Sequence, residues 1–314
     1  MDTISATISS APVDAPLVRV TVVICTRDRG DSITATLTSI WRCSDLPDEI
    51  VIVDQSEGSE TREALAELEP SPVPLRYIAD DTVGLSAARN TGIRAAAGDV
   101  LIFVDDDCVV DASWIDANRR VFEDHPEVQM VAGSVVPPDG FDWSNGYVPN
   151  LAMTDGNSQR HPYVMGANLA IRVRTAEQVG PFDEALGAGS PGKSGEDLDY
   201  LMRVYKLFGH SSVYGISRPL VVHEGGGRFG DARYRIVESY GFGEGALLGK
   251  LVRTRDSQAV SFARLIFSGY WRNFVAWAVH RSNPPGFRRV RHAARGLFYG
   301  LKAARPVTTE TTRE

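Results

Sequence analysis

The sequence lacks a hydrophobic run long enough to cross a lipid bilayer. Residues 261–281 contain large apolar groups, but Arg264 and Arg272 interrupt them, and a membrane-spanning helix needs about 20 predominantly apolar residues. A secretory signal has basic residues ahead of an apolar run. The first 16 residues do not have this layout. We therefore expect a cytoplasmic protein that does not cross the membrane.

Cysteine is scarce as well. Cys25, Cys43 and Cys108 are odd in number and have no metal-ligand spacing, so we expect reduced thiols, as in a cytoplasmic protein. The chain also has no Gly-x-Ser-x-Gly sequence, which argues against a hydrolase built on a nucleophilic serine of that kind.

Positive charge is sparse in most of the chain and concentrated near its end. Residues 1–249 hold 20 lysines and arginines against 37 aspartates and glutamates, whereas residues 250–305 hold 12 against one. The two regions therefore face different surroundings. Because the bulk of the chain is acidic, we expect no nucleic-acid partner.

Strand and helix patterns alternate in the N-terminal half. Strand-like runs cover residues 17–25, 49–53, 73–79 and 100–104, with helical patterns between them. The last run is apolar throughout, which is typical of a strand buried on both faces. This alternation predicts an α/β fold with a doubly wound sheet flanked by helices.

Polar side chains follow three of these strands, at the edge where open α/β sheets bind ligands. They are Thr26-Arg27, Asp54-Gln55 and Asp105-Asp106-Asp107. In one interpretation the three aspartates are solvated loop residues, one of which caps the next helix. In the other, Asp105 and Asp107 hold a divalent cation, Mg²⁺ or Mn²⁺, because adjacent carboxylates repel one another and oxygen ligands suit these ions.

A second group of acidic residues lies in the segment SGEDLDYLMRVYKLFGH. Leucine, methionine and tyrosine side chains repeat there with helical spacing, which places Glu196 and Asp197 in the first turn of a helix that Gly209 closes. Compensation of the helix dipole is one explanation for acidic residues at that position, and proton transfer is the other.

The chain resembles the family 2 glycosyltransferases of GT-A fold over about residues 18–230. The resemblance rests on six segments in the family's order and at roughly its spacing: VTVVICTRDRG, EIVIVDQSEGS, VGLSAARNTGI, GDVLIFVDDDC, MGANLAIR and GEDLDYLMRVY. It implies a Rossmann-like mixed sheet and an inverting enzyme that moves a sugar from a nucleoside diphosphate to an acceptor hydroxyl. It also implies a glycan or lipid-linked acceptor, as in the assembly of cell-surface polysaccharide or glycolipid.

The resemblance implies a donor site at the polar strand ends. Residues expected to contact the nucleotide sugar are Thr26, Arg27, Asp54, Gln55, Gly84, Arg89, Asn90, Asp105 and Asp106. Many members have an aspartate where this chain has Gln55, and that aspartate usually contacts uracil. Because an amide donates hydrogen bonds as well as accepting them, the base cannot be assumed to be uracil here.

The resemblance also implies catalytic and metal-binding roles. Asp197 matches the family's general base, and Glu196 is its neighbour. The aspartate motif makes Asp105 and Asp107 metal ligands, and His223, after the strand-like run RPLVVH, matches a further ligand. A lone histidine is more often structural, so that alternative stays open for His223.

The C-terminal region is basic and amphipathic. The segment PGFRRVRHAARGLFYGLKAAR places apolar residues among six lysines and arginines. One interpretation is a helix at the surface of an anionic membrane, peripheral on its inner face. The alternative is a pair of basic helices packed on the acidic domain.

We divide the chain into four parts: a flexible tail (1–16), a GT-A domain (17–228), a basic amphipathic helical extension (229–305) and a second flexible tail (306–314). We interpret residues 137–161, which have no periodicity, as a loop over the acceptor side. Two other functions are a sugar-phosphate nucleotidyltransferase and a non-catalytic carbohydrate-binding protein. The loop CTRDRGDS lacks the glycine-rich pattern that the first would need, and the retained Asp197 argues against the second.

Overall fold

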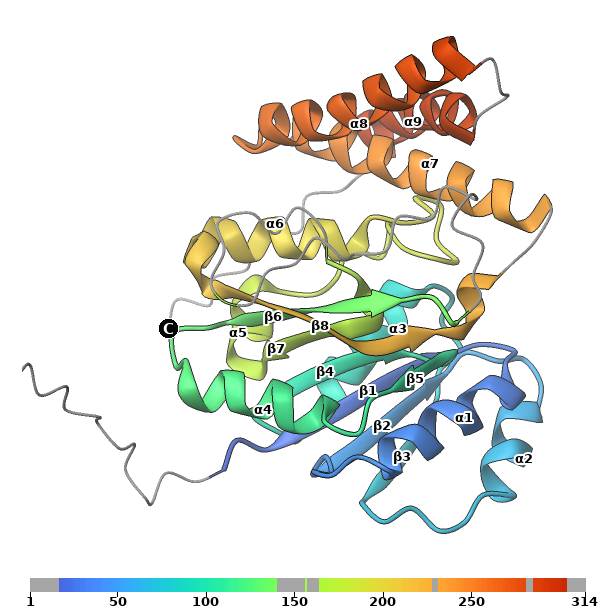
Figure 1. The fold of residues 1–314 in the computed structure, drawn as a ribbon, viewed down its shortest axis with the longest axis vertical. Coiled ribbons are helices and arrows are strands. Elements are labelled where there is room, and N and C mark those ends of the chain that lie inside the picture. The colour runs from blue at the N-terminus through green and yellow to red at the C-terminus, as the bar shows by residue number, and fades with distance from the viewer. Residues whose placement is uncertain (1–16, 140–155, 157–163, 228–230, 281–284, 304–314) are drawn as a thin grey trace, which may run out of the picture.

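The computed structural model describes residues 17–139, 156, 164–227, 231–280 and 285–303. Within these ranges the chain forms one mixed sheet with helices on both faces and a layer of three long helices beyond it (Figure 1). The predicted tails and most of the predicted loop 137–161 lie outside the described residues.

The sheet has the strand order β3-β2-β1-β4-β7-β6-β8-β5. Strands β1 to β4 are parallel, as the alternating pattern predicts, whereas β7 runs antiparallel to both β4 and β6. Strand β8 is parallel to β6 and antiparallel to β5. The strands are β1 (Val20–Thr26), β2 (Glu49–Asp54), β3 (Leu75–Ala79), β4 (Val100–Asp105), β5 (Cys108–Val110), β6 (Met130–Val136), β7 (Leu169–Arg172) and β8 (Val213–His223).

Two hydrophobic cores cover the two faces of the sheet, because alternate side chains of each strand point to opposite sides. The helices are α1 (Gly30–Trp41), α2 (Glu60–Ala66), α3 (Leu85–Ala95), α4 (Trp114–Asp124), α5 (Val173–Val179), α6 (Glu196–Phe208), α7 (Asp231–Arg253), α8 (Ala259–His280) and α9 (Pro285–Ala303). Helices α1 and α4 contribute to one core, and α3, α5 and α6 contribute to the other.

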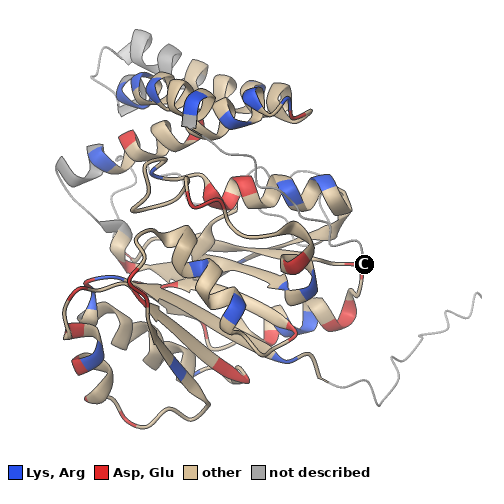
Figure 2. Ribbon diagram, turned by 180° about the vertical axis from the view of Figure 1, so that it is seen from behind, with Lys and Arg blue, Asp and Glu red and all other residues tan. Residues whose placement is uncertain are grey.

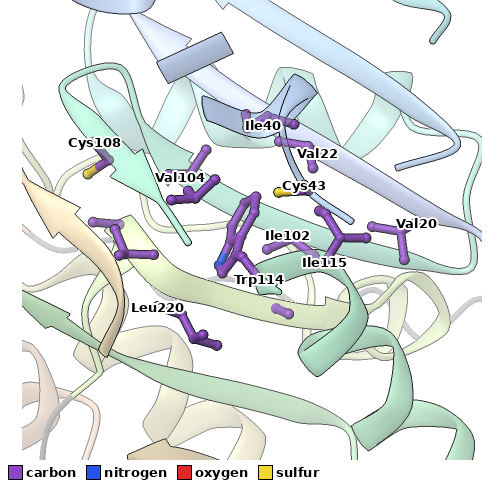
Figure 3. Close-up of a cluster of buried hydrophobic side chains, with 14 of the residues drawn as sticks. Val20, Val22, Ile40, Cys43, Ile102, Val104, Cys108, Trp114, Ile115 and Leu220 are labelled. Atoms are coloured by element: carbon purple, nitrogen blue, oxygen red, sulfur yellow. The ribbon is translucent and has the colours of Figure 1, made fainter. Parts of the chain in front are cut away.

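Trp114 is the largest fully buried side chain and lies at the centre of the first core. Side chains from β1, β4 and α1 surround its ring (Figure 3). The indole Nε1 donates a 3.0 Å hydrogen bond to Oδ1 of Asn168, so the ring is held without leaving its polar atom unpaired.

The turn after β4 leads the chain to the far edge of the sheet. Strand β5 starts directly after Asp107 and pairs with the end of β8, which sets Cys108 opposite His223. A residue more than 100 positions further along the chain therefore comes next to the aspartates.

The predicted C-terminal extension forms the layer of α7, α8 and α9, and α6 lies between this layer and the sheet (Figure 1). Glycines of α7 face glycine and alanine residues of α9, so the two backbones approach closely. No helix in the described ranges combines the length and apolar character needed to cross a membrane.

Candidate active site

Asp105 ends β4, Asp106 and Asp107 form the turn to β5, and each of the three aspartates has different contacts. Asp106 is buried and accepts a 2.7 Å hydrogen bond from Oγ1 of Thr26. Nη1 of Arg29 lies 3.0 Å from Oδ1 of Asp106 and 2.7 Å from Oδ2 of Asp107. Burial nevertheless raises the pKa of Asp106 to about 6, despite Thr26 and the Arg29 charge.

His223 faces the same turn from β8. Its Nε2 lies 3.3 Å from Oδ1 of Asp107 and 3.7 Å from Oδ2 of Asp105. Burial opposes protonation of the imidazole, but the two carboxylates outweigh it and raise the pKa of His223. For Asp105 burial opposes ionisation, yet the nearby imidazole of His223 and the charge of Arg89 lower its pKa.

These residues fit a divalent cation. The ligand atoms of Asp107, Cys108 and His223 lie within 4.8 Å of one another, and Asp105 borders His223. Within the described structure, Oδ1 of Asp107 and Nδ1 of His223 are buried without a hydrogen-bond partner. Burial raises the pKa of Cys108 well above its ordinary value, which makes a thiolate ligand unfavourable. Carboxylates with one imidazole remain, a set that suits Mn²⁺ or Mg²⁺.

Arg89 connects the aspartate turn with the second acidic group. Its side chain is buried, and its guanidinium contacts the rings of both Phe103 and Phe182. Nη1 lies 2.8 Å from Oε1 of Glu196, and Nη2 lies 3.5 Å from Oδ1 of Asp105. The end of β4 and the start of α6 therefore both contact the buried guanidinium group of Arg89.

Asp197 lies in the first turn of α6, where the helical periodicity predicts it. Its Oδ2 accepts a 3.3 Å hydrogen bond from the backbone N–H of Gly166, and Oδ1 accepts one from the N–H of Leu198. Burial and the neighbouring charge of Glu196 raise the pKa of Asp197 to about 7. A carboxyl group with such a pKa can accept a proton near neutral pH.

Asp54 and Gln55, which are expected near the nucleotide base, are hydrogen-bonded to neighbouring protein groups. Nε2 of Gln55 donates to Oγ1 of Thr82 and to the carbonyl of Gly84, and its Oε1 accepts from the N–H of Gly84. Asp54 accepts a 2.7 Å hydrogen bond from the hydroxyl of Tyr77. Gly84 has a φ of 120°, a value that favours glycine, and it precedes α3.

Two predicted donor contacts have other partners in the structure. Arg27 lies near the exposed carboxylates of Asp28 and Glu57. Asn90 is buried and hydrogen-bonds the backbone of Phe182 through both atoms of its amide. The donor-binding roles of Arg27 and Asn90 stay predictions.

Sequence reasoning missed Arg29, whose guanidinium contacts Asp106 and Asp107. It follows Arg27 by two positions in the loop after β1, so both belong to the polar segment that marks the site. Arg27 and Arg29 have the same side chain, so the sequence does not distinguish them. Only the path of the loop shows that Arg29 is the one that reaches the aspartates. A cavity of about 310 Å³ opens beside Arg29 and Asp107, bordered also by Thr36, Glu224 and Gly225.

The family model for Glycosyl transferase family 2 matches residues 21–179, half of the chain. The chain therefore belongs to glycosyl transferase family 2, whose members are glycosyltransferases, and its sheet has the GT-A fold that the resemblance implies. Membership favours the transferase reading over the nucleotidyltransferase.

The chain is similar in sequence to two glycosyltransferases of one organism. It is 25% identical over 209 residues to a glucosyl-dolichyl phosphate glucuronosyltransferase of Haloferax volcanii, covering 62% of this chain and 66% of that protein. It is 30% identical over 146 residues to the glycosyltransferase AglE of the same organism, covering 45% and 47%. The chain thus spans about two thirds and about half of their lengths.

A solved structure shows the same fold. The mannosyltransferase PcManGT from Pyrobaculum calidifontis, in complex with GDP-Man and Mn²⁺, matches with a TM-score of 0.61 at 17% identity. The match covers 92% of this chain and 88% of that one, so it includes the C-terminal helices.

Proposed function

We propose that the chain is an inverting, metal-dependent glycosyltransferase that moves a sugar from a nucleoside-diphosphate donor to an acceptor hydroxyl. One observation carries the proposal: Arg89 joins Asp105 and Glu196, so that the aspartate turn and Asp197 border one site. The two acidic groups then have separate tasks, one at the diphosphate and the other at the acceptor.

Asp105, Asp107 and His223 are the proposed ligands of Mn²⁺ or Mg²⁺. When bound, the cation supplies Lewis-acid stabilisation of the negative charge that develops on the departing diphosphate. Arg29 lies against Asp106 and Asp107, where its guanidinium can bind the same diphosphate. Thr26 orients the buried side chain of Asp106.

Asp197 is the proposed general base. Its carboxylate accepts the proton of the acceptor hydroxyl as that oxygen attacks the anomeric carbon, and the bond to the diphosphate breaks on the opposite face of the sugar. A single displacement of this kind needs no nucleophile from the protein. Glu196 balances Arg89, and the N–H of Gly166 fixes the direction of the Asp197 carboxylate.

The proposed acceptor is a sugar carried on a lipid phosphate. Support comes from the name of the relative, which acts on glucosyl-dolichyl phosphate, and from the C-terminal helices. Phe267 and Phe298 are 67% and 64% exposed, on helices whose exposed residues include Arg291 and Arg295. Several lysine and arginine positions lie along these helices (Figure 2). We propose that they hold the enzyme at an anionic membrane surface.

The metal proposal predicts that donor binding needs Asp107. With Mn²⁺ present, a panel that includes UDP-glucose, UDP-N-acetylglucosamine and GDP-mannose should contain a donor that raises the melting temperature. A ligand at 100 times its Kd adds about 2.7 kcal/mol of stability. Chelation should remove the shift, because the diphosphate loses its counter-charge.

The variant Asp107→Ala should lose the shift even in Mn²⁺, and Asp116→Ala, at the partly exposed Asp116 of α4, should keep it. Wild-type donor affinity in Asp107→Ala would remove the metal assignment.

A further inference from the structure

Helix α7 contacts the start of α6 along one of its faces. Oγ of Ser194 donates a 3.1 Å hydrogen bond to the carbonyl of Ser239. Four residues on, Gly243 lies so close to Ser194 that a Cβ at this position would overlap its backbone. Ser194 and Gly195 directly precede the Glu196–Asp197 pair, so α7 packs against the segment that begins the proposed catalytic turn.

Lys250 extends the same face of α7 by two further turns. It is only 7% exposed, and its Nζ lies 2.7 Å from Oδ2 of Asp183 and 2.5 Å from Oδ1 of Asp199. Asp199 belongs to the first turn of α6, and its other oxygen accepts a 3.0 Å hydrogen bond from Nε of Arg203. One buried ammonium group therefore joins three segments of the chain.

Asp183 connects Lys250 with the residues around Arg89. Asp183 follows Phe182, whose ring stacks on Tyr200 of α6 with centroids 4.1 Å apart. The same Phe182 ring lies under the guanidinium of Arg89. A shift of Asp183 relative to α6 would therefore disturb the contacts that place Arg89 and Glu196.

We propose that α7 belongs to the catalytic unit and that its Lys250 and Gly243 position the first turn of α6, including Asp197. The inference rests on the proposed function, because it assigns these residues to the geometry of the proposed general base. Neither Lys250 nor Gly243 contacts Asp197 or the three aspartates in the described contacts, so both are positioning residues. A boundary at residue 228 would then separate the base from the helix that holds it.

The chain offers matched controls for both contacts. Lys206 and Asp256 form another lysine–aspartate pair between α6 and the C-terminal helices, with an N–O distance of 2.8 Å, but Lys206 lies in the last turn of α6 and is exposed. Gly269 is a helical glycine of α8 with open space at its Cβ position. Lys206→Met and Gly269→Ala therefore repeat the two chemical changes away from the proposed base.

The experiment compares Lys250→Met and Gly243→Ala with these controls in the full-length chain. Release of UDP or GDP from UDP-glucose and GDP-mannose, in Mn²⁺, gives kcat and KM. We expect kcat to fall by about 10- to 100-fold in both variants, because a misplacement of about 1 Å costs this much, with KM for the donor within about threefold. Lys250→Arg should recover part of kcat, and the controls should stay near wild type.

Hydrogen exchange of the amides of residues 196–200 is the second measurement, and it needs no substrate. Both variants should exchange faster there than the controls do. Unchanged exchange, or a lower melting temperature with normal kcat, would overturn the inference. The variant Asp197→Asn separates a failure of the positioning role from a failure of the proposed function. If Asp197→Asn loses turnover while Lys250→Met and Gly243→Ala keep it, only the positioning role fails. If Asp197→Asn keeps turnover, the proposed function fails, and the exchange data alone decide whether α7 holds the turn.

Discussion

Single buried charges organise the site at the scale of residues. Arg89 is 2% exposed and faces two carboxylates and two aromatic rings, so protein groups compensate its charge. Removing one partner of such a group leaves an uncompensated buried charge, which typically costs 3–5 kcal/mol. The arrangement therefore makes the start of α6 and the end of β4 depend on one another.

The variant Asp197→Asn tests the proposed general base. It keeps the size of the side chain but removes its basicity, so turnover should fall by about 10²- to 10⁴-fold while donor affinity stays near wild type. In the wild type, kcat should fall as the pH drops through about 7, where Asp197 takes up its proton. Initial rates from pH 5 to 9 measure both effects, and near-normal turnover of the variant would reduce Asp197 to a helix-cap residue.

The substitution Asp197→Asn should raise the stability of the folded protein at high pH, although it lowers turnover. The pKa of Asp197 is raised in the folded protein, so the folded state loses stability as the pH rises from the unfolded pKa to the folded one. Asparagine stays uncharged, and the variant should melt above the wild type at pH 8. This advantage should shrink as the pH approaches 4, a trend that melting curves across this range record.

At the scale of elements, α7 and α9 are joined through small residues. A Cβ at Gly245 or Gly249 of α7 would overlap the backbone of α9, and one at Gly300 of α9 would overlap the backbone of α7. Leu247 of α7 is fully buried in a hydrophobic cluster that also includes Leu186. Helix α7 thus contacts both α9 and the segment that precedes α6.

Alanine substitutions at two helical glycines should have opposite signs. Gly245→Ala should destabilise by about 1–3 kcal/mol, because its methyl group meets the backbone of Ala293 in α9. Gly269→Ala should stabilise by about 0.5–1 kcal/mol, because its Cβ meets open space and alanine restricts the unfolded chain. Denaturant unfolding of the two variants gives both values. Equal effects would mean that α7 and α9 do not approach as closely as described.

At the scale of the whole molecule, the charge asymmetry follows the division into layers. Some basic residues of the C-terminal helices pair with acidic ones within that layer or with the domain below it: Arg289 with Glu244, and Lys250 with Asp183 and Asp199. Others, such as Arg291, Arg295 and Lys302, are exposed. The packed-helix interpretation therefore fits the paired residues, and only the exposed set is available for the proposed contact with a membrane.

Binding to anionic vesicles should depend on that exposed set. If each near-surface charge contributes about 1 kcal/mol, replacing Arg291, Arg295 and Lys302 by glutamine should weaken binding roughly 100-fold, and added salt should weaken the wild type. Sedimentation with vesicles of anionic and of neutral lipid measures the effect.

The variant Arg289→Gln is the matched control for this test. It should lower the melting temperature, because it breaks the pair with Glu244, and should leave vesicle binding nearly unchanged. Equal binding to neutral vesicles, or no loss in the triple variant, would contradict the membrane proposal.

Patterns of neighbouring residues account for the parts of the fold and of the candidate site that could be predicted from the sequence. The apolar run Val100–Val104 with carboxylates at its end identifies β4 and the ligand edge, because a parallel strand buried on both faces has few other patterns. Helical spacing likewise places Glu196 and Asp197 in the first turn of α6. The α/β class and the basic C-terminal region needed only composition and periodicity.

Tertiary structure decided which charges meet. Arg29 rather than Arg27 reaches the aspartates because of the path of one loop, and His223 does so because β5 pairs with β8 across more than 100 residues. The contact of Lys250 with Asp199 depends on the packing of α7 over α6. Strand and helix periodicity is a property of neighbouring residues, so the sequence by itself determined the elements and the residues at their ends. Contacts between distant segments depend on the packing of all the elements together, and only the folded chain determines them.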